Sequence, residues 1–383
     1  MPYDIFAYLY KKITSTMVIE DLALLFIRGL GSRGIVHLIE HFGSAEAIYG
    51  ATLHTLINDA GLRKDVAERI VAREGMQEAK REIEYCRKNQ IYPIAATDEE
   101  YPEALRETSD RPHVLFARGN IKALNMRTLS MVGTREASPS GIHSADKIIA
   151  GLATQIPNLC IVSGLAYGID SACHRSALAH NATTVDVVAD TLPNVSPAPN
   201  RNLADEILRM GGAIVSELHS QTKQNGQLFI ARNRIIAGLS MGTLVVESPA
   251  SGGSLATADI ADSYGRTVMA LPGRITDTQS FGSNNLIRTG KARMVLTAND
   301  VIEDMGWDTE FSTTEAATEA SPLDKLNPTE QIIYKAFDSA VTLNWAELTA
   351  QTGLTMGELA MSLMDMELKG VVRCLPGKRY ERI

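Results

Sequence analysis

Two arginines interrupt an apolar stretch in the segment "QLFIARNRIIAGLS" (residues 227–240). Arg232 and Arg234 flank Asn233, and the apolar run that follows predicts a helix beginning near Asn233. A guanidinium offers paired N–H donors whose spacing matches two oxygens of a phosphate. The whole chain carries a formal net charge of −8, so the two arginines indicate a local anion site and not a generally basic surface.

A third arginine follows a predicted strand that ends near Gly133. Arg135 comes just after this strand, and Ser138 stands at the expected start of the next helix, where backbone N–H groups can meet an anion. Open parallel sheets bind their ligands outside the carboxyl ends of the strands. We therefore expect Arg135, Ser138 and the Arg232–Arg234 pair to face one ligand, a phosphate.

An aromatic residue precedes the paired arginines. Phe229 is predicted to lie in a loop that also holds Lys223. An exposed ring beside cations suits a single-stranded nucleic acid, because bases stack on the ring and the cations bind the backbone. Alternatively, Phe229 is a core residue and the arginines pair with Asp170, Glu217 or Glu247. We expect one of the two arginines, and not both, to have such a structural role.

Glycines and serines follow several other predicted strands. One loop contains Ser163 and Gly164, and another contains Gly252, Gly253 and Ser254. Glycine lets backbone N–H groups approach a ligand closely, which would place a row of anion sites along one edge of the sheet. Each loop could instead be an ordinary tight turn, with the last of these serines as a helix N-cap.

No pattern in the sequence indicates a catalytic centre. The turn after the first strand of the central region is neither the GxGxxG of a dinucleotide-binding fold nor the GxxxxGK[ST] of a Walker-type NTPase. His174 follows Asp170 by four residues and could be a general base. Such a histidine more often makes a local hydrogen bond. Ser163, Asp170 and His174 are close in sequence, but nothing in the sequence fixes their geometry as a catalytic set. We expect no enzymatic activity, no metal and no cofactor.

The central region alternates short β-branched runs with helical runs. Continuous apolar runs are typical of strands buried on both faces, and their alternation with helices predicts a doubly wound, mostly parallel sheet. We expect an extended Rossmann-like α/β domain over residues 89–306. The predicted strands are 128–132, 160–163, 183–188, 213–216, 242–247, 267–272 and 292–296.

Two regions precede this domain. Residues 1–18 are interpreted as an N-terminal extension, and residues 19–88 as a helical domain of the SAM or helix-hairpin-helix type. The turn Gly29-Leu30-Gly31 is typical of a helix-hairpin-helix motif, in which glycines let the backbone approach a DNA phosphate. The segment at residues 59–70 is a candidate for a second such motif. Ordinary turns in a small helical bundle are the equally weighted alternative.

Two further regions follow the central domain. Residues 307–322 are predicted to be an acidic linker, and residues 303–322 contain six acidic residues and no Lys or Arg. Residues 323–383 show three helical runs and a hairpin, the pattern of a winged helix. Its third helix is acidic, which disfavours contact with a DNA groove and favours a protein-interaction role. Basic residues of the predicted wing leave DNA binding open: Arg373, Lys378, Arg379 and Arg382.

The composition is that of a globular protein, with 45% hydrophobic and 21% charged residues. The four cysteines show no CxxC spacing, which is typical of free thiols in a reducing cytoplasm. No apolar run approaches the ~18 residues of a membrane span, and the N-terminus lacks the pattern of a signal peptide. We expect a cytoplasmic location and no membrane partner.

A series of motifs identifies a family resemblance. In order, the chain contains "MVGTREASPSG", "IVSGLAYGIDSACH", "IVSE", "FIARNRIIAGLS", "VVES", "GGSLATADIA", "ALPGRI" and "GSNNLIRTGKA". Over about residues 19–306 the sequence resembles the DprA/Smf family of DNA-processing proteins. The resemblance implies a Rossmann-like domain that binds single-stranded DNA, forms homodimers and loads the RecA recombinase onto incoming DNA during natural transformation. It implies no established catalytic activity.

The resemblance also assigns the site by motif position. The resemblance implies that the DNA-binding residues are Arg135, Ser163, Gly164, Phe229, Arg232 and Arg234. Gly252, Gly253 and Ser254 form the corresponding Gly/Ser loop. The chain departs from the family pattern at Ile230, where a proline is usual, and at Ser251, where a basic residue is frequent. A further departure is "DTLPNVSPAPN", where the family tends to have Gly-Leu-Asp and Tyr-Pro.

Two further expectations complete the interpretation. The apolar pair Leu286-Ile287 beside polar residues hints at the homodimer contact. The alternative function is that of a Rossmann-like nucleotide hydrolase of the phosphoribohydrolase type. Such enzymes have a similar sheet but carry PGGxGT followed by a Glu, whereas the comparable loop here is "SPASGGSLATADIA".

Overall fold

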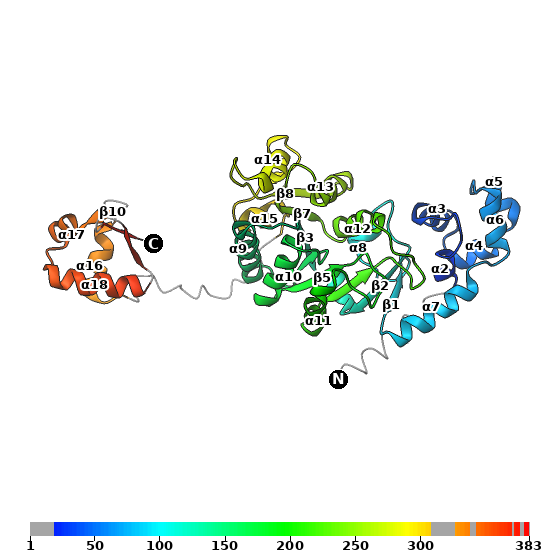
Figure 1. Cartoon of the computed structure of the whole chain (residues 1–383), viewed down its shortest axis with the longest axis horizontal. Helices are drawn as coiled ribbons and strands as arrows, with labels where there is room; N and C mark the ends of the chain where they lie inside the picture. Colours follow the sequence, from blue (N-terminus) through cyan, green and yellow to red (C-terminus); the bar gives the residue numbers. More distant parts are fainter. Residues whose placement is uncertain (1–18, 308–325, 338–341, 370, 376–378, 383) are drawn as a thin grey trace. The chain divides into compact units, whose positions relative to one another are not determined.

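The computed structural model describes residues 19–307, 326–337, 342–369, 371–375 and 379–382. The chain divides into two compact units between residues 309 and 310. The first unit contains a helical region and a large sheet, and the second contains three helices and a small sheet (Figure 1). Within the described residues, no helix combines the length and the apolar character that crossing a bilayer requires.

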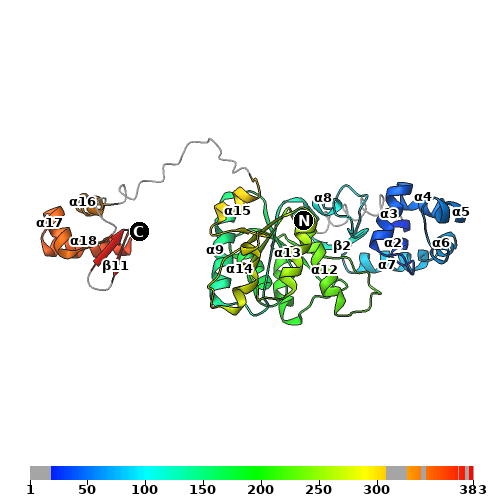
Figure 2. The ribbon, with the colours of Figure 1, turned by 90° about the horizontal axis from the view of Figure 1, so that it is seen from above.

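Six short helices precede the sheet, and in both views of the ribbon they gather beyond its β1 end (Figures 1 and 2). Ser44 and Thr52 cap two of them by accepting a hydrogen bond from the backbone N–H three residues later. Gly75 has a φ of 90° and lies so close to the Ala23 carbonyl that a Cβ would clash, so this turn requires glycine. The helices are α2 (Ile19–Leu24), α3 (Ser32–Phe42), α4 (Ala45–Gly50), α5 (Leu53–Asn58), α6 (Lys64–Val71) and α7 (Met76–Lys88).

Nine strands form the large sheet in the order β1-β2-β6-β5-β4-β3-β7-β8-β9. β1 pairs with β2 and β2 with β6 in antiparallel fashion, and the other neighbours are parallel. The mostly parallel sheet and the seven predicted strands are confirmed. The strands are β1 (Tyr92–Ala95), β2 (Val114–Gly119), β3 (Arg127–Gly133), β4 (Leu159–Ser163), β5 (Thr183–Val187), β6 (Ala213–Ser216), β7 (Gly242–Glu247), β8 (Thr267–Ala270) and β9 (Arg293–Met294).

Helices cover both faces of the sheet. Alternate residues of β7 explain this, because Leu244 packs with α9 and α10 in one core while Val245 packs with α12 and α13 in the other. The sheet-flanking helices are α8 (Glu103–Arg106), α9 (Pro139–Gln155), α10 (Ile169–Ala179), α11 (Arg201–Arg209), α12 (Gln227–Gly238), α13 (Gly253–Ser263), α14 (Phe281–Arg288) and α15 (Ala298–Asp304). Short 3-10 turns η1 (Ile121–Asn125), η2 (Ala198–Asn200) and η3 (Thr278–Ser280) complete the connections.

The helical region shares a core with the antiparallel end of the sheet. Phe116 of β2 and Ile214 of β6 belong to the same cluster as the buried leucines of α2 and α3. Buried His113 and Asp21 join the two regions through a contact of 2.9 Å between Nε2 and Oδ1. The Tyr85 hydroxyl donates to the Leu192 carbonyl at 2.9 Å. This continuous packing holds the helical region against the sheet.

Two sequence expectations are corrected by the fold. The helix expected near Asn233 begins six residues earlier, at Gln227, so Phe229 lies on its first turn and not in the preceding loop. Leu286 is buried and Ile287 packs against the same core, so this pair is not an exposed apolar surface. Periodicity alone places helix boundaries poorly, and here the run through Phe229 continues the apolar face that follows.

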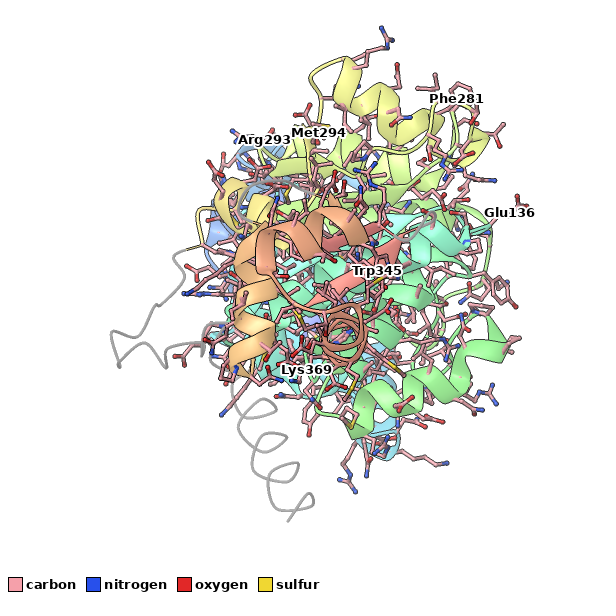
Figure 3. The ribbon with its side chains drawn as sticks, turned by 90° about the vertical axis from the view of Figure 1, so that its left-hand side faces the viewer. Glu136, Phe281, Arg293, Met294, Trp345 and Lys369 are labelled. Carbon is pink, nitrogen blue, oxygen red and sulfur yellow. The ribbon has the colours of Figure 1, made fainter. Side chains whose placement is uncertain are left out.

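The second unit contains α16 (Pro328–Ala336), α17 (Trp345–Thr352) and α18 (Met356–Leu368), with strands in the order β10-β12-β11. The strands are β10 (Thr342–Asn344), β11 (Val372–Leu375) and β12 (Arg379–Arg382). Capping boxes begin all three helices. Lys369 forms an ion pair with buried Glu330 of α16 at 2.7 Å, and its position is labelled in Figure 3.

Candidate nucleic-acid interface

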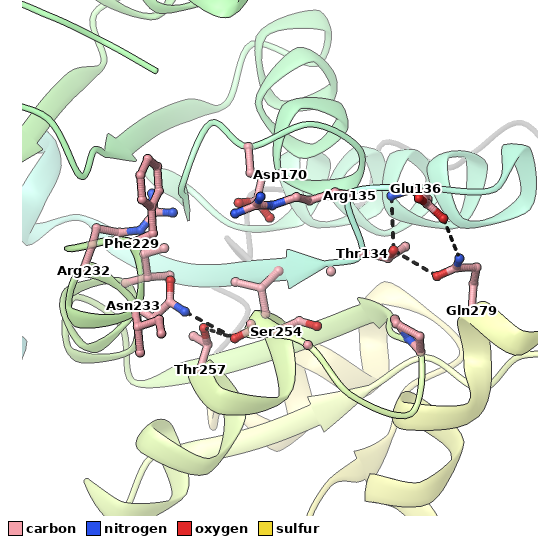
Figure 4. Close-up of a pocket in the computed structure, with 18 of the residues that line it drawn as sticks. Thr134, Arg135, Glu136, Asp170, Phe229, Arg232, Asn233, Ser254, Thr257 and Gln279 are labelled. Atoms are coloured by element: carbon pink, nitrogen blue, oxygen red, sulfur yellow. Dashed lines mark hydrogen bonds between the residues drawn. The ribbon is translucent and has the colours of Figure 1, made fainter. Parts of the chain in front are cut away.

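A hollow of about 710 Å³ lies outside the carboxyl ends of β3 and β7. Its walls come from the loop after β3, the first turns of α12 and the loop before α13 (Figure 4). We name it the Arg135 hollow. It contains seven of the twelve residues predicted to bind DNA: Arg135, Phe229, Arg232, Asn233, Gly252, Gly253 and Ser254.

Arg135 is the exposed cation of this hollow. The structure gives its side chain no hydrogen bond or ion pair with any described residue, and it extends from the end of β3 into the hollow (Figure 4). The backbone beneath it is fixed, because the Thr134 carbonyl accepts from Ile169 N at 3.1 Å and the Thr134 hydroxyl donates to Gln279 at 2.9 Å. A guanidinium on such a fixed loop is available to an anion.

The N-terminus of α13 provides backbone donors on the other side. Gly252 and Gly253 are exposed, and no side chain caps this helix. The Asn233 side-chain amide donates to the Gly253 carbonyl at 3.3 Å, which ties the loop to α12. Ser254 is buried and its hydroxyl donates to Ser248 at 2.9 Å. The free N–H groups and the positive end of the helix dipole can therefore receive a phosphate.

Phe229 contributes the apolar wall. It lies on the first turn of α12 and is partly exposed, and its neighbour Ile230 is 65% exposed. Both residues line the Arg135 hollow. An aromatic ring beside an arginine and free backbone donors can stack on a base whose phosphate is held at α13.

Arg232 occupies the interior behind this surface. It is 6% exposed, and Nη1 donates to the Gly164 carbonyl at 2.8 Å and to the Val187 carbonyl. Burial lowers its pKa, while the carboxylates of Asp170 and Asp186 act in the opposite direction. Arg232 therefore holds together the loop after β4 and the end of β5, a structural role made through backbone carbonyls and not through the ion pair that the alternative interpretation predicted.

Arg234 also has a structural role, so the expectation that only one of the two arginines would do so is wrong. Its Nη2 forms an ion pair with Glu217 at 2.6 Å, and Nε lies 4.0 Å from Asp110. The side chain is absent from the walls of the Arg135 hollow and lines two neighbouring hollows instead. Residues 232 and 234 point to different sides because they are two positions apart on a helix.

Ser163 and Gly164 support the site from within. The Ser163 side chain is buried, and its hydroxyl donates to the Met131 carbonyl at 2.7 Å. A Cβ at Gly164 would lie 2.3 Å from the Arg232 guanidinium, so glycine is required there to fit the arginine. Neither residue lines the Arg135 hollow, and the expected direct contact of these residues with a ligand is not supported by their positions.

The expected phosphate position at the start of α9 is already occupied by a carboxylate. Ser138 caps this helix, and its backbone N–H and hydroxyl donate to Glu247 at 2.9 and 2.7 Å. Glu247 lies so close to Gly141 that a Cβ there would meet its carboxylate. The anion at this helix N-terminus is therefore the carboxylate of Glu247. The expectation that Ser138 and the start of α9 bind a phosphate is not supported by this arrangement.

Lys223 lies outside the walls of the Arg135 hollow, in the loop between β6 and α12. This loop is attached to the helical region, because Ser220 donates from both N and Oγ to the buried carboxylate of Glu82 at 2.8 and 2.5 Å. The His219 ring packs against the Phe26 ring in a tilted arrangement, with the ring centroids 4.4 Å apart. The lysine is exposed and the structure assigns it no contact in the site.

Buried ionisable groups lie beneath the site. Burial raises the pKa of Asp186 to about 8, although Arg232 acts to lower it. Burial likewise lowers the pKa of His174 to about 3, and its Nδ1 lies 2.7 Å from the Thr184 hydroxyl. His174 is fully buried, so it makes the local hydrogen bond expected of it and reaches no ligand. Among the described residues, no group of three or more His, Cys, Asp or Glu side chains could hold a metal ion.

Sequence reasoning missed several walls of the Arg135 hollow. Thr134 and Gln279, 145 positions apart, form a hydrogen bond with each other, and Pro249, Thr257 and Ile230 also line the hollow. Thr134 stands beside Arg135 in the same motif and could have been included. Gln279 lies in the 3-10 turn η3, nine residues beyond the end of β8, and no motif in the sequence marked it.

The winged-helix unit presents a different surface. Exposed α18 residues include Glu358, Asp365 and Met361. On the wing, Arg373 pairs with Glu381 at 2.6 Å and Arg379 donates to the Thr342 hydroxyl at 2.7 Å. The other basic wing positions that left DNA binding open, residue 378 and the side chain of residue 382, lie outside the described part of the chain.

Sequence comparison relates this chain to known proteins. The family described as DNA recombination-mediator protein A matches residues 93–306, and the DprA winged helix domain matches residues 317–378. Protein Smf of Escherichia coli (strain K12) is 33% identical over 290 residues, which cover 74% of this chain and 75% of that protein. DNA processing protein DprA of Streptococcus pneumoniae is 39% identical over 207 residues, covering 54% of this chain and 72% of that protein.

Structural comparison gives the same relationship. The X-ray structure of DprA from Streptococcus pneumoniae aligns with a TM-score of 0.65 and 32% identity, covering 75% of this chain and 98% of that one. A structure of DNA processing protein A from Helicobacter pylori, which concerns the single-stranded DNA binding mode of that protein, aligns with a TM-score of 0.50 and 26% identity. It covers 56% of this chain and 94% of that one. From the family match over more than half of its length and these relatives, this chain belongs to the DprA/Smf family of DNA-processing proteins.

Proposed function

We propose that this protein binds single-stranded DNA in the Arg135 hollow. The observation that carries the proposal is the meeting of three complementary groups: an exposed arginine without a partner among the described residues, a partly exposed aromatic ring and an uncapped helix N-terminus. The single-stranded DNA binding of the Helicobacter pylori relative supports it. By position, Arg135 and the Gly252–Gly253 backbone hold a phosphate, and Phe229 stacks on the neighbouring base.

This chemistry favours a single strand over a duplex. In a duplex each base is stacked on its neighbours and paired, so a base must be freed before it can lie against Phe229. A single strand offers its bases without that cost. The buried Arg232, Ser163 and Gly164 have a supporting role in this proposal, because they fix the loops beneath the surface.

The biological role that we propose is that of a cytoplasmic recombination mediator. In this role the protein protects incoming single-stranded DNA and loads RecA recombinase onto it during natural transformation. The family description as a recombination mediator supports the role. No catalytic step is part of it.

We also propose a homodimer formed by the sheet-containing unit. With Leu286 and Ile287 in the core, the exposed apolar side chains near the β9 edge are the better candidates for the contact. Met294 is 52% exposed and Leu296 63%, and Figure 3 labels Arg293 and Met294 next to each other. Met294→Glu should shift the protein to monomer in sedimentation experiments. Met210→Glu should not, because Met210 is an exposed residue at the end of α11, next to β6 and away from the β9 edge.

A binding assay tests the main proposal. Fluorescence anisotropy with a labelled oligothymidine and with a duplex of equal length should show tighter binding of the single strand. The affinity should fall between about 50 and about 200 mM salt, with a log–log slope near −0.7 for each phosphate neutralised. An affinity that does not change with salt would contradict a phosphate-binding site. Release of free base from nucleoside monophosphates would instead support the hydrolase alternative.

A further inference from the structure

Two further hollows lie between the Arg135 hollow and the helical region, and each shares lining residues with the next. The first, of about 440 Å³, shares Ile230 with it and is named the Ile230 hollow. The second, of about 640 Å³, shares Arg33, Asp110 and Arg234 with the Ile230 hollow and is named the Arg33 hollow. The three form one track from Phe229 across α12 to the loops that begin α3 and α6.

The charges along this track suit a polyanion. Arg33 is 81% exposed and lines both of the further hollows. Arg234 lines them as well, and its Nη1 is buried without a hydrogen-bond partner among the described residues. Asp110 is the carboxylate in both linings; it lies 3.8 Å from Arg33 and 4.0 Å from Arg234 and accepts a hydrogen bond from Tyr264. Arg234 is already paired with Glu217 at 2.6 Å, so the exposed guanidinium of Arg33 is the group in these hollows that a phosphate can reach.

The apolar part of the track lies between the two charged ends. Ile230 is 65% exposed and borders Ala231, which is also exposed. Ile230 has an arginine-containing hollow on each side. Its aliphatic side chain can contact the bases of a strand while the DNA backbone spans from one arginine to the next. This is the order of groups that an extended single strand meets along its length.

The loops of the Arg33 hollow also leave room for a nucleic-acid backbone. Gly29 and Gly61 have φ values of +89° and +67°, which other residues rarely adopt. No atom lies within 4 Å of a Cβ built at Gly31 or Gly61. The two glycine turns, found at 29–31 and near 61 in the sequence, thus line one hollow.

We infer that the strand bound at Phe229 continues across Ile230 into the Arg33 hollow, so that the helical region supplies a second backbone-binding patch. The inference rests on the proposed function and extends its footprint from the sheet edge to the loops of α3 and α6. The occupant is the same DNA strand, because the track begins at the proposed binding site and carries cations at both ends.

An oligonucleotide-length series with the full chain tests this. Oligothymidines from about 6 to about 30 nucleotides should bind wild type with affinity that rises until both patches are covered. Arg33→Ala should weaken the long oligonucleotides about three- to tenfold, reduce their salt slope by about 0.7, and leave the shortest bound oligonucleotide unchanged. The matched control is Arg87→Ala, which removes an exposed arginine of α7 outside the track and should change neither.

A second pair of variants separates charge from folding. Gly31 is the N-cap of α3, with extended backbone angles and no side-chain cap. Gly31→Asp and Gly31→Asn should both cap the helix and maintain the melting temperature. Only Gly31→Asp adds a negative charge to the track, so only it should weaken the long oligonucleotides.

The outcomes distinguish the inference from the function on which it rests. If Arg33→Ala and Gly31→Asp bind oligonucleotides of every length as wild type does, the inference of a second patch is overturned. The proposed site in the Arg135 hollow is then unaffected. An equal loss on short and long oligonucleotides would also overturn it, because the effect would then belong to the first site. Wild type that binds no oligonucleotide of any length would overturn the proposed function and the inference with it.

Discussion

Replacing Arg135 by alanine should separate binding from stability. Its side chain is exposed and makes no hydrogen bond or ion pair with a described residue, so its removal should change the free energy of unfolding by less than about 0.5 kcal/mol. If it donates to a phosphate, the lost charge-assisted contact is worth about 1.5–3 kcal/mol, which corresponds to a 10- to 100-fold weaker affinity for single-stranded DNA. Arg135→Lys should restore only part of this loss, because an ammonium cannot make the paired contact.

The assay is anisotropy with a labelled oligothymidine, accompanied by thermal unfolding of each variant. Arg201→Ala is the matched control, since Arg201 is an exposed arginine at the start of α11 outside the Arg135 hollow. It should leave the affinity within about twofold of wild type. The reasoning would be refuted if Arg135→Ala bound single-stranded DNA as tightly as wild type but had a melting temperature many degrees lower. Arg135 would then be a structural ion-pair partner.

Three further predictions concern the residues around it. Phe229→Ala should weaken single-stranded DNA binding by about 1–3 kcal/mol through lost stacking while the protein stays folded, and an unfolded variant would show that the ring is core. Arg232→Ala should lower the free energy of unfolding by about 2–5 kcal/mol, because it leaves a cavity and removes the donor to the buried Gly164 and Val187 carbonyls; a stable variant that only loses DNA affinity would show direct contact instead. Because the pKa of Asp186 is raised to about 8, the folded state holds a proton that the unfolded chain has lost between roughly pH 4 and pH 8, so stability should fall as pH rises through this window. Asp186→Asn should flatten that part of the pH–stability curve in denaturant titrations, and an unchanged slope would contradict the assignment.

The short parallel strands could be predicted from the sequence, whereas β1 and β2, at the antiparallel end of the sheet, could not. The runs that became β3 and β7 are continuous and apolar because helices cover both faces. β1 is only four residues long and contains Pro93, which argues against a strand in a single sequence. Its residues pair with residues of β2 that lie 19 to 25 positions away, and no local pattern encodes that choice.

The chemistry of the site was predictable where backbone position determines it. Arg135 follows a buried strand by two residues, and the strand end fixes where the side chain begins, so its place in the hollow follows from the motif. The same holds for Gly252 and Gly253, which precede a helix directly. For these residues the sequence determined both the location and the type of contact offered.

Which arginine reaches the ligand was decided by the tertiary structure. Arg135, Arg232 and Arg234 have the same side chain, yet one is exposed, one is enclosed by carbonyls and carboxylates, and one is paired with Glu217. Those partners come from β4, β5 and the loop after β6, and only folding brings them to α12. The sequence determines which hydrogen-bond donors exist and which strands form beneath them. The tertiary structure determines which of these donors remain free, because a buried guanidinium must be paired with acceptor groups from distant parts of the chain.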